Sequence, residues 1–177
     1  MSHTRMAQAR RRARELAVQL LYSLGNRSDQ SVDVALDLFC GEGGVAESEP
    51  PEVKEYLRFL VRGAWTRRSE SDDVLLRVIT GWRPERIVSV DRAVLRLAVF
   101  EGFLERSVPF AVAISEAVDI AQTFGTEDSG RFVNGVLARV VRHLIPESER
   151  NKKSAGKKRG EGQDHGPSEA GTLPADR

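Results

Sequence analysis

The amino-acid sequence predicts an all-α protein, with a helical domain over residues 1–146 and a tail over residues 147–177. Three observations support this fold class. Apolar residues recur at the three- and four-residue spacing of helices with one buried face, no stretch shows sustained strand-like alternation with a hairpin turn, and glycine or proline separates the periodic segments. The pattern gives six to eight helices, and the domain is long enough to bury its own core.

The first half of the domain contains four helical segments. The first has its apolar face over residues 13–24 and ends at Gly25, a usual helix stop. A short helix is expected over residues 31–39. After a loop rich in Gly, Ser, Glu and Pro, a longer helix follows over residues 52–68, and another over residues 72–79. The apolar face of the first helix comprises Leu16, Ala17, Leu20, Leu21 and Leu24.

Three more helices follow the break at residues 81–84. Their apolar spacing covers residues 90–101, 110–123 and 133–144. The expected capping or opening residues are Ser89, Pro109, and either Asp128 or Ser129, and the expected stops of the last two helices are Gly125 and Pro146.

Composition excludes several classes of protein. No apolar run approaches the roughly 18–20 residues of a membrane span. Cys40 is the only cysteine, so an intramolecular disulfide is impossible, and the histidines are too dispersed to suggest a zinc site. A reducing, cytoplasmic location is the simplest interpretation. The Arg-rich N-terminus is not expected to be a targeting signal, because Gln19 and Tyr22 interrupt the apolar stretch that follows it.

The motifs of common enzyme classes are missing from the sequence, which has no P-loop, dinucleotide-binding glycine pattern, zinc-protease motif or nucleophile elbow. We therefore expect neither an enzyme nor a cofactor or metal. The glycines of residues 41–44 suit a surface loop, since no strand precedes them. Cys40, next to apolar Leu38 and Phe39, is better interpreted as a small buried residue than as a nucleophile.

The charge is unevenly distributed along the chain. The 27 Lys and Arg nearly balance the 26 Asp and Glu, but five arginines and no acid lie in residues 1–14, and six cations and no acid lie in residues 150–159. The rest of the chain has 16 basic and 26 acidic residues. Two basic ends flanking an acidic body suggest two kinds of partner. The tail has few large apolar residues, so we expect it to be disordered.

The run Arg10, Arg11, Arg12 and Arg14 directly precedes the first apolar face. Cations at a helix N-terminus oppose the helix macrodipole, at a cost of tenths of a kcal/mol each. Phosphate groups would offset that cost through bidentate, charge-assisted hydrogen bonds. Nucleic acid is therefore the favoured partner, while an acidic protein surface and plain solvation remain open.

Two further features are candidates for binding. Tyr22 shares a stripe with Arg14 and Val18, and an aromatic ring beside cations suits single-stranded RNA, although a partly buried core role is nearly as plausible. Residues 124–134 form a helix stop followed by a helix start, in which Phe132 points either inward or at a ligand. A purely structural role is the more common one for such a turn.

At these residues the chain resembles the NusB family of bacterial transcription antitermination factors. Three stretches carry the resemblance: RRRARELAVQLLYS at 10–23, ERIVSVDRAVLRLAVFE at 85–101, and VPFAVAISEAVDIAQTFGTEDSGRFVNGVLARV at 108–140. The resemblance implies about seven helices in two packed halves and no catalytic activity. It also implies binding of the boxA element of nascent RNA together with NusE, a small-subunit ribosomal protein, so that RNA polymerase reads through terminators in ribosomal RNA operons.

The resemblance also implies roles for individual residues. The RNA-binding residues would be Arg10, Arg11, Arg12, Arg14, Tyr22, Asp128, Arg131 and Phe132, and those facing NusE would be Glu85 and Asp91. The family often has glutamate at the position of Asp91. NusE is basic, so the acidic body suits it.

Two other functions are alternatives for such a helical domain. A similar helical domain occurs fused to a ribosomal RNA methyltransferase, but we expect no such enzyme because only about 31 residues follow the domain here. The other alternative is a helical adaptor that binds only proteins and has no RNA affinity. The sequence leaves both a monomer and a homodimer open.

Overall fold

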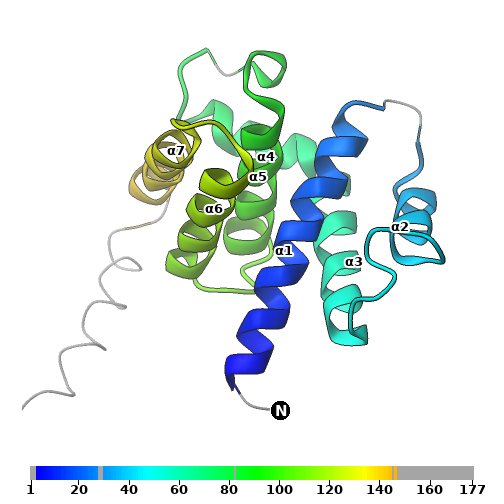
Figure 1. Cartoon of the computed structure of the whole chain (residues 1–177). Coiled ribbons are helices and arrows are strands. Elements are labelled where there is room, and N and C mark those ends of the chain that lie inside the picture. Colours follow the sequence, from blue (N-terminus) through cyan, green and yellow to red (C-terminus); the bar gives the residue numbers. More distant parts are fainter. Residues whose placement is uncertain (1–2, 28–29, 82, 145, 147–177) are drawn as a thin grey trace, which may run out of the picture. The chain divides into compact units, whose positions relative to one another are not determined.

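The computed structural model describes residues 3–27, 30–81, 83–144 and 146, and these contain helices and no strand. The predicted disorder of the tail after Pro146 lies outside the described residues. Figure 1 shows the helices in order. They are α1 (His3–Gly25), α2 (Val32–Cys40), α3 (Pro51–Thr66), α4 (Arg68–Leu76), α5 (Ser89–Ala98), α6 (Phe110–Phe124) and α7 (Ser129–Leu144), with a 3₁₀ turn η1 (Pro84–Arg86) and a π-helical turn η2 (Val99–Leu104).

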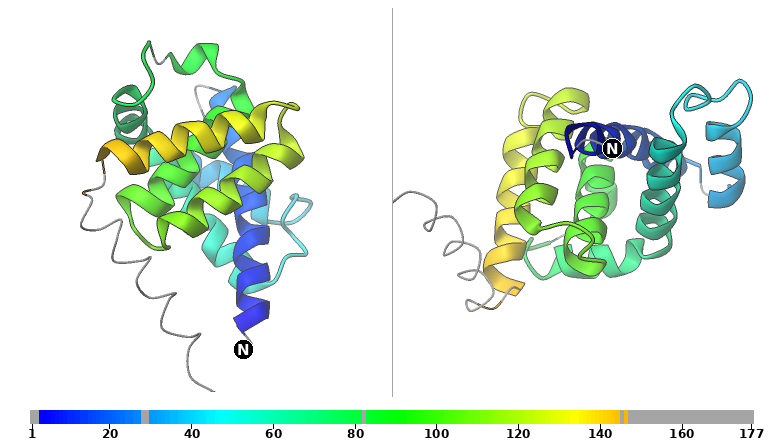
Figure 2. Two further views of the ribbon diagram at one scale, coloured as in Figure 1. Left: turned by 90° about the vertical axis from the view of Figure 1, so that its left-hand side faces the viewer. Right: turned by 90° about the horizontal axis from the view of Figure 1, so that it is seen from below.

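The helices form two packed halves, as the resemblance implied. α1 packs against α2 and α3 of its own half and against α5 of the other half. α6 and α7 form a helical hairpin that packs on α5 (Figure 2). α1 therefore contacts both halves, and its exposed face lies between them.

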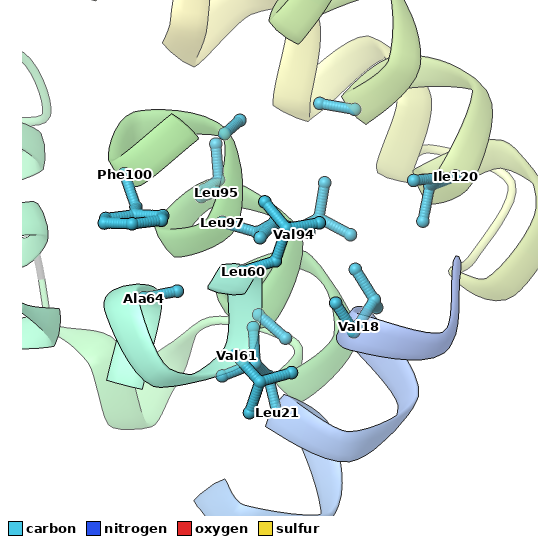
Figure 3. Packing of buried hydrophobic residues seen from close by; sticks show 14 of the residues in the cluster. Val18, Leu21, Leu60, Val61, Ala64, Val94, Leu95, Leu97, Phe100 and Ile120 are labelled. Carbon is cyan, nitrogen blue, oxygen red and sulfur yellow. The ribbon is translucent and has the colours of Figure 1, made fainter. Parts of the chain in front are cut away.

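Interlocking aliphatic side chains fill the core between these helices. Leu16 and Leu24 of α1, Leu57 and Leu60 of α3, and Leu95 of α5 are almost completely buried. Figure 3 shows this packing, with side chains from α1, α3, α5 and α6 meeting around Val94. Burial of each such side chain contributes roughly 1.5–3 kcal/mol to folding. The apolar stripes predicted from the sequence are confirmed as the buried faces.

The main difference from the predicted elements is the length of α1. Its apolar face begins at Ala13, but the helix begins at His3, nearly three turns earlier. Salt bridges from Arg5 to Glu52 and from Arg12 to Glu49 hold these polar turns against the start of α3. Hydrophobic periodicity does not detect them, because the partners of this segment are charged.

A π-helical turn continues α5 where the sequence predicted an ordinary helix. In η2 the amide of Glu105 bonds the carbonyl of Phe100 at 2.8 Å, a five-residue step. Opposite this turn lies Gly63 of α3, where any Cβ would overlap the Phe100 ring. The close approach of α3 and η2 brings the buried carboxylate of Glu101 near Tyr56 of α3.

No helix in the described part of the chain is both long and apolar enough to cross a membrane.

Candidate nucleic-acid interface

Arg10, Arg11 and Arg12 are exposed on α1. Because α1 begins at His3, they lie about two turns inside the helix rather than at its N-terminus. The helix macrodipole acts mainly within the first turn. The prediction that these arginines are destabilised by the macrodipole is therefore wrong. Whether these three arginines can bind a nucleic acid depends instead on their exposure and on their neighbours.

Arg11 and Arg12 are paired with surface carboxylates. Arg11 contacts Asp119 of α6 at 3.2 Å, and Nε of Arg12 donates a 2.7 Å hydrogen bond to Glu49. Glu15 lies 3.8 Å from Arg11 and 3.3 Å from Arg12. Exposed pairs of this kind contribute about 0–1 kcal/mol each, so an anionic ligand could displace them at small cost.

Arg10 has a different neighbour. Among the described residues it pairs with no carboxylate, and its guanidinium carbon lies 5.2 Å from the centre of the Tyr56 ring. This separation is within the range of a cation–π interaction. Arg10 thus contacts an aromatic ring, while no carboxylate among the described residues neutralises its charge.

Arg14 lies in the core, which does not fit the predicted contact with RNA. Its exposed fraction is 4%, and that of Glu101 is 1%. Nε of Arg14 donates hydrogen bonds to both Glu101 oxygens at 3.0 and 2.9 Å, and Nη2 donates one to Oε1 at 2.8 Å. Nη1 reaches Glu116 of α6 at 3.3 Å. Arg14 therefore joins three helical elements and offers no surface to a phosphate.

Tyr56 completes this buried network, and neither Tyr56 nor Glu101 is among the binding residues predicted from the sequence. The Tyr56 hydroxyl donates a hydrogen bond to Glu101. Burial, followed by this hydrogen bond, raises the pKa of Tyr56 to about 12, so the hydroxyl remains a donor at neutral pH. A signal was available, because Glu101 continues an apolar stripe, and an acid at such a position requires a buried partner.

Tyr22 is accessible, as expected of a binding residue. Its exposed fraction is 43%, and it lines a small surface pocket with Trp65, Arg92 and Arg96. It lies twelve residues from Arg10, which is about 18 Å along a helix. Tyr22 and the arginine run can therefore contact the same ligand only if the ligand is extended.

α6 approaches α1 where Arg11 contacts Asp119, and the turn between α6 and α7 follows at the end of α6. Asp128 and Arg131 are highly exposed there and lie 3.8 Å apart. Phe132 is half-buried and packs against the core. The turn is closed by a 2.8 Å hydrogen bond from the Thr126 amide to Ser129 Oγ. The structure thus places Asp128 and Arg131 at the surface around the start of α7.

The two expected partner-binding residues differ in accessibility. Glu85 is exposed on η1. Asp91 is only 4% exposed, which does not fit a predicted direct contact with a partner. Its Oδ1 has no hydrogen-bond partner among the described residues. Burial raises the pKa of Asp91, and a hydrogen bond from Ser129 at the start of α7 opposes that shift.

Replacing Asp91 with asparagine should stabilise the protein at pH 7 by about 1 kcal/mol, because a neutral amide loses less on burial than a carboxylate. A raised folded-state pKa means that stability is highest with Asp91 protonated and falls as pH rises from 3.8 through the folded value. Urea unfolding between pH 4 and pH 8 should show a smaller decline for Asp91→Asn than for the unmodified protein. Exposed Glu85→Gln is the control and should change neither quantity; an equal decline in Asp91→Asn would contradict the assignment.

Comparison with known proteins gives consistent matches. The NusB family model matches residues 11–142. The chain is 45% identical over 139 residues to a transcription antitermination protein NusB of Symbiobacterium thermophilum, covering 77% of this chain and 91% of that protein. It is 43% identical to a NusB of an Anaeromyxobacter species, covering 82% of this chain and 98% of that protein.

Solved structures with this fold include NusB of T. maritima, with a TM-score of 0.68 and 34% identity, covering 80% of this chain and 96% of that one. A NusB chain solved with NusE and double-stranded RNA has a TM-score of 0.66 and 24% identity, covering 76% of this chain and 97% of that one. The second likeness supports the fold alone.

Proposed function

Because this chain belongs to the NusB family, we propose that it is a transcription antitermination factor that binds boxA-type single-stranded RNA together with NusE. In this role it would join the RNA polymerase antitermination complex and promote read-through of ribosomal RNA operons. Relatives that are 36–45% identical carry the name transcription antitermination protein.

The observation that carries the proposal is the group of three adjacent exposed arginines on the outer face of α1. Arg11 of this group contacts Asp119 of α6, and exposed Arg131 follows the α6–α7 turn. Each guanidinium can make bidentate bonds to a phosphate, and binding of RNA releases counterions. The carboxylates of Asp119 and Glu49 would exchange their arginine partners for the RNA backbone.

Tyr22 supplies a ring on which an unpaired base could stack, as in single-strand recognition. We propose that RNA runs from the arginine run past the α6–α7 turn, where Asp128 can accept hydrogen bonds from bases. Half-buried Phe132 supports this turn through its contacts with the core. Arg14 is left out of this path because it is buried.

We propose that NusE binds a surface that includes exposed Glu85. Buried Asp91 would support this surface from the interior of the protein. A basic ribosomal protein suits an acidic residue at this position. A chain of the same fold was solved in a complex of NusB, NusE and double-stranded RNA, so the fold is compatible with NusE and RNA as partners, whereas the RNA proposed for this chain is single-stranded.

The alternative function, a protein-binding adaptor without RNA affinity, has one observation in its favour. Arg11 and Arg12 already bind carboxylates, as an acidic protein surface would offer. The two functions differ in one experiment, a titration of fluorescent boxA-like RNA with the intact chain at moderate salt, with and without NusE. We expect binding by the chain alone and tighter binding with NusE. Binding of NusE without any RNA affinity would support the adaptor instead.

A further inference from the structure

We propose that Tyr56 is a positioning residue for RNA binding, because it holds the Arg10 guanidinium at the surface in a state ready for phosphate. This inference rests on the proposed function. It assigns a role in ligand binding to a side chain of α3, outside the arginine run and the α6–α7 turn.

Among the described residues no carboxylate occupies the donors of Arg10, which contacts the Tyr56 ring instead. The guanidinium carbon is 5.2 Å from the Tyr56 ring centre. A guanidinium that packs by its face against an aromatic ring keeps its edge N–H groups open to a planar anion. Arg11 and Arg12 instead direct N–H groups at Asp119 and Glu49, which a phosphate must first displace.

The Tyr56 ring is itself fixed in place. Its hydroxyl donates to Glu101, which the buried Arg14 holds through three hydrogen bonds. The ring also stacks with Phe59, with centroids 5.7 Å apart and planes inclined by 21°. A continuous set of contacts therefore connects the buried ion pair to the exposed cation.

Fixing Arg10 in advance should increase affinity for RNA. A long, flexible side chain loses rotamer freedom when it binds, and a side chain that is already ordered loses less. An exposed cation–π contact corresponds to a factor of about two to five in an equilibrium constant. That factor is the contribution expected from Tyr56.

A double-mutant cycle on the full chain tests the proposal, with boxA-like single-stranded RNA as the probe. The variants are Tyr56→Leu, Arg10→Gln and their combination, with Tyr56→Phe as the conservative variant. We expect Tyr56→Leu to weaken binding about two- to fivefold when Arg10 is present and to have no effect in the Arg10→Gln background. Tyr56→Phe should bind nearly as well as the unmodified chain, because the ring remains.

The outcomes separate this inference from the proposed function. Equal losses from Tyr56→Leu in both backgrounds would overturn the inference, because Tyr56 would then act through the fold. Unchanged binding in Tyr56→Leu would also overturn it. If Arg10→Gln alone binds normally, both the inference and the proposed RNA contact of Arg10 fail.

A second variant leaves the core intact in case Tyr56→Leu does not fold. Arg10→Lys keeps the charge but removes the planar group, so we expect weaker binding together with an unchanged thermal midpoint and an unchanged slope of log K against log salt. Binding equal to that of the unmodified chain would contradict the role of the stacked guanidinium.

Discussion

Replacing Glu101 with alanine should lower the free energy of unfolding by about 3–5 kcal/mol. Arg14 would remain buried after losing three hydrogen bonds, and the Tyr56 hydroxyl would lose its acceptor. An uncompensated buried charge is among the most destabilising changes a core can suffer, whereas the intact pair contributes less than its attraction suggests because both groups are desolvated. Equilibrium urea unfolding at pH 7 measures the effect.

Glu116→Ala is the matched control. Glu116 is bound to the same arginine at 3.3 Å, but its side chain is 21% exposed compared with 2% for Glu101. It should cost no more than about 1 kcal/mol. Replacing both members of the buried pair, as Arg14→Met with Glu101→Leu, should recover much of the loss. Equal and small effects of Glu101→Ala and Glu116→Ala would contradict the assignment of the buried pair.

Replacing Arg10, Arg11 and Arg12 together with glutamine should weaken RNA binding and flatten its salt dependence. If each arginine neutralises one phosphate, the slope of log K against log salt falls in magnitude by about 2.1, at roughly 0.7 per contact for a single strand. Affinities measured by fluorescence anisotropy at several salt concentrations give this slope directly.

The control for this variant removes the same charge elsewhere. Arg58, Arg62 and Arg77 lie outside the candidate interface, and the first two are also paired with surface acids, Asp37 and Asp33. Replacing these three arginines with glutamine should change the slope of log K against log salt by less than about one unit. This small change would reflect the lower net charge of the protein. An equal fall in both variants would show that net charge, rather than the face of α1, governs binding.

Most of the fold could be predicted from hydrophobic period alone. The stripes on α1, α3, α5 and α7 have the period of a helix and are buried, and glycine and proline lie near the ends of the helices. The first turns of α1 could not be predicted this way, because Glu49 and Glu52 stabilise them from the α2–α3 loop and α3.

The candidate site was harder to predict, because exposure depends on tertiary packing. Arg14 is adjacent in sequence to the exposed run, yet it faces a carboxylate that is 87 residues away. Asp91 lies within the span of an apolar stripe and was expected to face a partner, but the start of α7 covers it. Position in a motif identified the neighbourhood of the site, while the structure decides which of its side chains a ligand can contact.

The sequence preference of the intact chain tests the central claim most directly. The measurement is the ratio of dissociation constants for scrambled and boxA-like single-stranded RNA at moderate salt, in the presence of NusE. The proposed function predicts tighter binding of the boxA-like RNA by at least about tenfold, or about 1.4 kcal/mol. Equal affinity for the two RNAs would contradict it, because phosphate contacts alone carry no sequence information.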